Sequence, residues 1–151
     1  IPDGPFAIRR VLEDPYVLLT PAGAPEVGAP SITLRAVARL PLIGFSDPEL
    51  DQELLTHLRR TGREPSFVYR TNDNPTVHGF VAEGLGYALM PRLTVDEDDP
   101  KIGFIPAVSG MPPRSLAMVW HADRQLPESV TRFIDLAEQI CADLSAEWAA
   151  P

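Results

Sequence analysis

The stretch Thr71–Pro91, TNDNPTVHGFVAEGLGYALMP, decides the fold of this chain. It opens with three hydrogen-bonding residues, 72–74, and then has a proline where the first turn of a helix tolerates a missing N–H. Gly84 and Gly86 predict the end of that helix, and the apolar run 87–90 predicts a short buried strand. One face of the helix is marked by apolar residues at helical spacing, namely Val77, Phe80, Val81 and Leu85.

The segment VAEGLGYALMP, residues 81–91, resembles the V-a-a-G-l-G-i-a-l-L-P signature of the effector-binding domain of LysR-type transcriptional regulators. The polar loop and helix before it have the family's spacing, and the flanking segments match in order. The resemblance covers nearly all of this chain, although the chain does not cover all of the family's domain. It implies an α/β, two-lobed type II periplasmic-binding-protein-like fold, with a complete second lobe and a partial first lobe.

The resemblance also implies how the chain divides. Residues 1–20 would form part of the first lobe and the hinge, residues 21–95 the second lobe, and residues 96–151 the return to the first lobe with a C-terminal helix. The family's winged helix-turn-helix and the first βαβαβ segment of its first lobe have no counterpart in this sequence. We therefore expect either a truncated fragment, or a second chain or an unusual packing that covers the exposed sheet.

Composition limits the possible functions. The chain has 151 residues, of which 44% are hydrophobic and 23% charged, as in globular proteins. Its formal charge of −8 argues against contact with a nucleic-acid backbone through these residues. No apolar run approaches the roughly 20 residues of a membrane helix. No signal peptide is visible, and the lone Cys141, expected to be a buried structural thiol, fits a reducing cytoplasm.

Strands and helices alternate along the middle of the chain, which predicts βαβ units with right-handed crossovers. The expected strands are 6–12, 16–20, 41–45, 66–70, 87–90, 102–105 and 115–120, and residues 21–30 and 106–114 are expected to be loops. A short helix begins after Thr33, a longer one begins at Ser46–Pro48 and stops at Gly62, and the last begins at Pro127. The apolar stripe of the last helix comprises Val130, Phe133, Ile134, Ala137, Ile140, Cys141, Leu144 and Trp148.

Polar loops follow two of these strands, 41–45 and 66–70. Ligands of parallel sheets bind beyond the carboxyl ends of the strands, and both loops begin helices, where free N–H groups and the helix dipole favour an anion. Helix capping alone is the alternative role for Ser46 and for residues 72–74. LysR-type regulators use hydroxyl and amide groups at the corresponding positions, as the resemblance implies. The predicted effector contacts are therefore Phe45, Ser46, Thr71, Asn72, Asp73 and Asn74.

The ionisable side chains suggest little beyond this site. Asp73 would repel an anion, so a ligand that meets it should carry an amine or a hydroxyl. His57 and His78 are expected to be surface or packing residues, whereas His121 could reach a cleft. Arg92 is expected to form a local salt bridge, with contact to an anionic effector as the less favoured role.

No motif predicts catalysis. The sequence contains neither a G-x-S-x-G elbow nor a phosphate-binding G-x-x-x-x-G-K-[ST] loop. The three histidines lack metal-binding spacing, and the acidic turn 96–99 lacks the glycine and ligand spacing of an EF-hand. We therefore predict no catalytic residue, no metal ligand and no cofactor.

The leading hypothesis is an effector-sensing domain of a LysR-type transcriptional regulator. A small molecule would bind between the lobes and control DNA binding by the absent helix-turn-helix. The expected setting is a cytoplasmic homo-oligomer that contacts no membrane, and that contacts DNA only through the absent N-terminal domain. The alternative is a solute-binding protein of the type II periplasmic class, and an α/β enzyme is less favoured.

Overall fold

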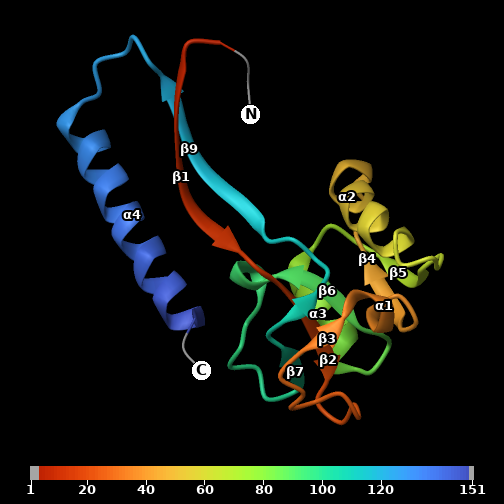
Figure 1. Ribbon diagram of the computed structural model, residues 1–151. Helices are drawn as coiled ribbons and strands as arrows, with labels where there is room; N and C mark the ends of the chain where they lie inside the picture. The colour runs from red at the N-terminus through yellow and green to blue at the C-terminus, as the bar shows by residue number, and fades with distance from the viewer. Residues whose placement is uncertain (1–3, 150–151) are drawn as a thin grey trace. The chain divides into compact units, whose positions relative to one another are not determined.

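The computed structural model describes residues 4–149, except for the side chains of residues 48–51. It contains two compact units, Pro15–Pro113 and the paired segments Ile1–Asp14 and Arg114–Pro151 (Figure 1). The lobe boundaries expected at residues 20 and 95 stay a prediction.

The unit of residues 15–113 is built on short strands that the sequence predicted. β2 (Tyr16–Pro21) pairs antiparallel with β6 (Ala88–Pro91) on one side and with β7 (Ile102–Ile105) on the other. β4 (Pro41–Gly44) pairs in parallel with β5 (Ser66–Arg70). A parallel bridge from Leu42 to Tyr87 joins β4 to the residue before β6, so the two sheets meet there.

The helices of this unit follow the predicted βαβ order, while the handedness of the crossovers stays a prediction. α2 (Pro48–Arg59) connects β4 to β5, and α3 (Asn74–Ala82) leads from β5 toward β6. The prediction of a loop over residues 106–114 is wrong in part, because β8 (Val108–Ser109) pairs in parallel with β3 (Ile32–Thr33). The short α1 (Leu34–Val37) begins, as predicted, at Thr33, whose Oγ1 accepts the Ala36 N–H at 3.2 Å. A 3-10 turn, η1 (Arg92–Thr94), follows β6.

Alternate residues of the strands bury their side chains on opposite faces of the sheet. One face packs against α1 and α2, and the other against α3, as predicted for an apolar run covered on both faces. The first cluster includes Leu18, Leu42, Leu54, Leu58, Leu89 and Ile105. The second includes Leu19, Ile43, Val77, Val81, Ala88 and Met90. The loop at the end of β4 is therefore carried by a packed scaffold, whereas the neighbouring β5 is largely exposed.

The glycine turn after α3 has two parts with different physical reasons. Gly84 has φ +74°, the left-handed conformation in which a helix commonly ends. At Gly86 a Cβ would lie 2.8 Å from the carbonyl oxygen of Pro41, so the missing side chain lets this segment approach β4. The prediction that Leu85 belongs to the apolar face of α3 is wrong. Its side chain is 55% exposed, because the chain has already left the helix.

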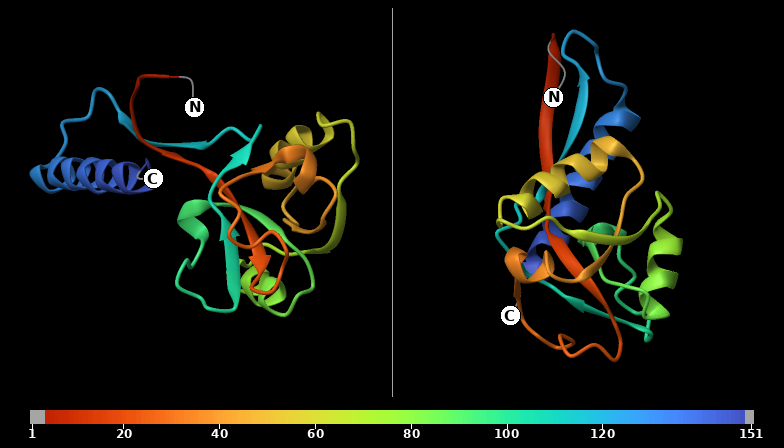
Figure 2. Two further views of the ribbon diagram at one scale, coloured as in Figure 1. Left: turned by 60° about the horizontal axis from the view of Figure 1, so that its bottom comes forward. Right: turned by 90° about the vertical axis from the view of Figure 1, so that its right-hand side faces the viewer.

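The other unit is a pair of long strands with one helix. β1 (Phe6–Asp14) pairs antiparallel with β9 (Arg114–His121), and α4 (Glu128–Ala149) packs against β1 (Figure 2). At the end of the pair, the fully buried Asp14 accepts a hydrogen bond from Arg114 Nη2 at 2.6 Å. All three elements match the sequence prediction in kind and begin within one residue of the expected positions, but β1 runs two residues past its predicted end at Leu12.

Candidate functional site

The loops that follow β4 and β5 are joined by the side chain of Asn72. Its Oδ1 accepts the backbone N–H groups of Ser46 at 2.9 Å and of Asp47 at 2.8 Å. The parallel pairing of Gly44 with Arg70 brings the two loops together, because it places the carboxyl ends of the strands side by side. Asn72 therefore holds the chain at the start of α2, although it lies more than twenty residues further along the sequence.

This arrangement fixes the orientation of the Asn72 amide. Both partners of the oxygen are N–H donors, so the NH₂ group must be the other end of the side chain. No acceptor for that NH₂ group is found in the part of the chain that the structure describes. Asn72 is exposed, as is Ser46 beside it. An amide donor and a hydroxyl thus stand together at the edge of the sheet.

Arg70 is a member of this site that the sequence reasoning missed. Its Nη1 donates to the carbonyl oxygen of Phe45 at 2.9 Å, and its guanidinium carbon lies 4.0 Å from the centroid of the Phe67 ring. These contacts hold a positive charge at the loop that begins α2. A basic residue at the last position of a strand, directly before a polar loop, was the signal that could have identified it.

Asp73 caps the next helix, as the sequence allowed. Its Oδ2 accepts hydrogen bonds from the hydroxyl of Thr76 and from the Thr76 N–H, the latter at 2.9 Å. The Thr76 hydroxyl and then its N–H hold the pKa of Asp73 below its ordinary value. The Asp73 N–H in turn donates to Thr71 Oγ1 at 3.1 Å. The site therefore contains a carboxylate that is ionised at neutral pH and already engaged as a cap.

Asn74 does not join the other predicted residues in these contacts. It lines a different hollow, of about 770 Å³, together with His78, Asp96 and Asp99. Among the described atoms, the His78 Nε2 in this region is buried and has no hydrogen-bond partner. Hydrogen bonds thus join the two loops through Ser46 and Asn72 and through Phe45 and Arg70, and Thr71 is bonded to Asp73 within its own loop. Contact of all six residues with an effector stays a prediction.

The remaining ionisable candidates have local surroundings. Arg92 forms the predicted local salt bridge, with Nε 2.6 Å from Oε1 of Glu97. His121 is exposed in the other unit and lies 3.9 Å from the carboxylate of Asp123. Cys141 is only half-buried on α4, so the expectation of a buried thiol is wrong. Within residues 4–149, as far as they are described, no three His, Cys, Asp or Glu side chains are grouped to hold a metal ion.

Among the described residues, no helix is both long enough and apolar enough to cross a membrane.

The proteins that this chain resembles include transcriptional regulators and their domains. The chain is 26% identical over 141 residues to the probable HTH-type transcriptional regulator LrrA of Synechococcus elongatus, covering 93% of this chain and 47% of that protein. The LysR family regulator HinK of Pseudomonas aeruginosa superposes with a TM-score of 0.78 at 19% identity, over 95% of this chain and 51% of that one. The BenM effector binding domain with its effector benzoate gives 0.75 at 14% identity, over 100% of this chain and 69% of that one.

The chain thus spans about half the length of the curated relative LrrA, at 47%. Its fold is the type II periplasmic-binding-protein-like α/β fold of the LysR effector-binding domains, as the sequence predicted. The family model described as the LysR substrate binding domain matches residues 1–142. The chain belongs to the LysR substrate binding domain family.

Proposed function

We propose that this chain senses a small-molecule effector for a LysR-type transcriptional regulator, and that it binds the effector on the loops 45–47 and 71–73. The observation that carries the proposal is the Asn72 bridge, because Oδ1 is bonded to Ser46 and Asp47 while the NH₂ group remains available as a donor. A residue that serves only as a cap needs the acceptor oxygen alone. Here the same side chain also presents a donor at the edge of the sheet.

The chemistry of the two loops favours a ligand with more than one polar group. The Asn72 amide and the Ser46 hydroxyl can donate to a carboxylate, and the guanidinium of Arg70 adds positive charge beside them. Asp73 supplies negative charge, which suits an amine or a hydroxyl on the same ligand. Two backbone N–H groups at the start of α2 are already bonded to Asn72, so side chains rather than the helix N-terminus would bind the anion.

The remainder of the regulator completes the proposal. DNA contact would be made by a helix-turn-helix outside these 151 residues, because a formal charge of −8 opposes contact with phosphates. The relative LrrA is named as an HTH-type transcriptional regulator, and the BenM domain was solved with its effector benzoate. We place the regulator in the cytoplasm as a homo-oligomer, without catalytic activity of its own.

The test separates binding from capping. Asn72→Asp keeps acceptor oxygens for the two N–H groups but replaces the donor NH₂ with a carboxylate, and Ser46→Ala removes a hydroxyl while leaving the backbone bond in place. In the full-length regulator each variant should raise the effector concentration that gives a half-maximal response. The expected loss of binding free energy is about 1–3 kcal/mol, the cost of losing a polar partner. The urea unfolding midpoint of the 151-residue chain should stay close to that of the unmodified chain.

Asn74→Asp is the matched comparison: because Asn74 lines the other hollow, we expect it to weaken the effector response less than Asn72→Asp does. Unchanged dose–response curves for both Asn72→Asp and Ser46→Ala would show that these residues only cap helices and that the effector site lies elsewhere.

A further inference from the structure

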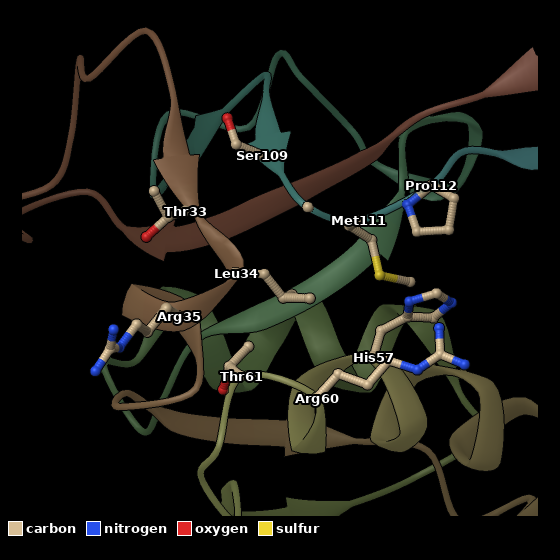
Figure 3. Close-up of a pocket in the computed structure, with 10 residues that line it drawn as sticks. Thr33, Leu34, Arg35, His57, Arg60, Thr61, Ser109, Met111 and Pro112 are labelled. Carbon is tan, nitrogen blue, oxygen red and sulfur yellow. The ribbon is translucent and has the colours of Figure 1, made fainter.

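A second hollow, of about 690 Å³, lies within the unit of residues 15–113, at the other end of α2 (Figure 3). Its walls come from α1, from the last turn of α2 and from the loop after β8. Leu34, which is 5% exposed, and the half-buried Met111 give it an apolar floor. His57 and Arg60 extend from the end of α2 toward the loop that carries Met111, whereas Arg35 points away from the hollow (Figure 3).

The charge of this hollow is opposite to that of the chain. The sequence has 21 acidic and 13 basic residues, yet none of the residues that line the hollow is acidic. His57 and Arg60 are three positions apart, the spacing that puts two side chains on one side of a helix. They therefore place two nitrogen donors beside the apolar side chains of Leu34 and Met111.

Arg60 differs from its neighbour Arg59 in a way that bears on function. Arg59 is bonded to the carboxylate of Glu64 through Nε at 2.9 Å and Nη2 at 2.6 Å. The Arg60 side chain has neither an ion pair nor a hydrogen bond among the described residues, although its backbone N–H donates to the Thr56 carbonyl oxygen at 3.2 Å. The helix dipole favours a cation near the end of a helix, which would account for the position of both arginines. Of these two arginines, however, only Arg60 lines the apolar hollow, and the dipole does not explain that difference.

We propose that this hollow is a second ligand site, which binds a small carboxylate with an apolar body. The carboxylate is held by the guanidinium of Arg60, whose planar fork matches two carboxylate oxygens, and the ring N–H of His57 is the second donor. The apolar body packs on Leu34 and Met111. Such a combination of an apolar lining with a few polar groups is typical of small-molecule sites.

This site is separate from the effector loops and does not depend on them. α2 begins beside the loop that Asn72 caps and ends at the hollow, and its twelve residues span about 18 Å at about 1.5 Å per residue. Failure of the effector proposal would therefore leave this inference standing. Asn72→Asp should not change binding here.

The experiment uses cyclohexanecarboxylate as the probe, titrated into the isotopically labelled 151-residue chain and followed by NMR. The expected result is saturable shifts of the His57 ring and of the Arg60 Nε–H signals. Arg60→Gln, which removes the charge and leaves a shorter polar side chain, should weaken binding by about tenfold, as expected for the loss of a charge-assisted hydrogen bond. His57→Gln should weaken binding by a smaller factor, and Arg59→Gln should leave it unchanged.

Two further ligands test the chemical class. Cyclohexanecarboxamide, the neutral isostere, and inorganic phosphate, which has no apolar body, should each bind at least about tenfold more weakly than the carboxylate, since each lacks one of the two recognised groups. Equal binding of the amide would refute the role of Arg60, and equal binding of phosphate would refute the role of the floor. Absence of saturable shifts, or an equal loss in Arg59→Gln, would overturn the site.

Discussion

The bridge made by Asn72 predicts a local loss of stability when it is removed. Asn72→Ala deletes the oxygen that accepts the N–H groups of Ser46 at 2.9 Å and Asp47 at 2.8 Å. Loss of a capping side chain costs about 0.5–2 kcal/mol. Two N–H donors lose their acceptor here, although the exposed Ser46 N–H can bond to water instead. We therefore expect a loss of about 1–2 kcal/mol, which is a factor of roughly 5–30 in the equilibrium for local opening of α2.

Native-state hydrogen exchange read by mass spectrometry is the suitable assay, because it reports on each helix separately. Peptides that cover α2, residues 48–59, should lose protection by roughly that factor, whereas peptides from α4 should not change. Asn72→Asp restores an acceptor and should restore the protection of α2. Asn74→Ala removes an amide that makes no hydrogen bond among the described residues and should leave α2 unchanged. Equal protection of α2 in Asn72→Ala and in the unmodified chain would refute the reasoning.

Two further predictions follow from close contacts. Gly86→Ala places a Cβ 2.8 Å from the backbone oxygen of Pro41 and should destabilise the chain by about 1–3 kcal/mol in urea unfolding. Gly79→Ala, in α3 with nothing within 4 Å of the new Cβ, should stabilise it by about 0.5–1 kcal/mol. An unchanged stability of Gly86→Ala would contradict the first expectation. Thr76→Val should raise the pKa of Asp73 toward its ordinary value, as measured by carboxyl NMR titration, because the Thr76 hydroxyl is the main cause of the lowering. The pKa of Asp73 is lower in the folded chain than in the unfolded chain, so this bond stabilises the fold above the unfolded pKa, and its contribution is lost as pH falls through the folded pKa. The free energy of unfolding of Thr76→Val should therefore depend less on pH. An unchanged pKa of Asp73 would count against the bond.

The elements that the sequence predicted well are those with local signals. The apolar run before Phe45 and the proline at position 48 mark a buried strand and a helix start within a few residues of each other. The structure has β4 and α2 at these places. By contrast, β3 and β8 contain two residues each, too few to show any alternation, and their pairing joins residues 76 positions apart, as Ile32 with Val108. Such a pair is visible only in the folded chain.

The candidate site shows the same limit at the level of single residues. The run 72–74 offered three polar side chains with similar capping chemistry, and nothing local distinguishes them. In the fold Asp73 caps its own helix, Asn72 reaches the helix before it, and Asn74 lines a separate hollow. What separates them is the register of β4 against β5, which places Gly44 opposite Arg70. A sequence pattern therefore finds the loop, while the pairing of the strands decides which residue acts in which place.

The last helix shows what hydrophobic periodicity measures. The stripe on α4 predicted the helix, but only part of it is covered, since Ile134 is 6% exposed while Phe133 is 63% and Ile140 49% exposed. α4 packs against β1, one strand of a two-stranded sheet, and neighbouring strands lie about 4.8 Å apart, whereas a helix with its side chains is about 10 Å wide. One strand can cover only the central line of the stripe, so the residues on its flanks stay in contact with solvent. Periodicity thus gives the direction of the apolar face, and the width of the opposing layer determines how much of that face is buried.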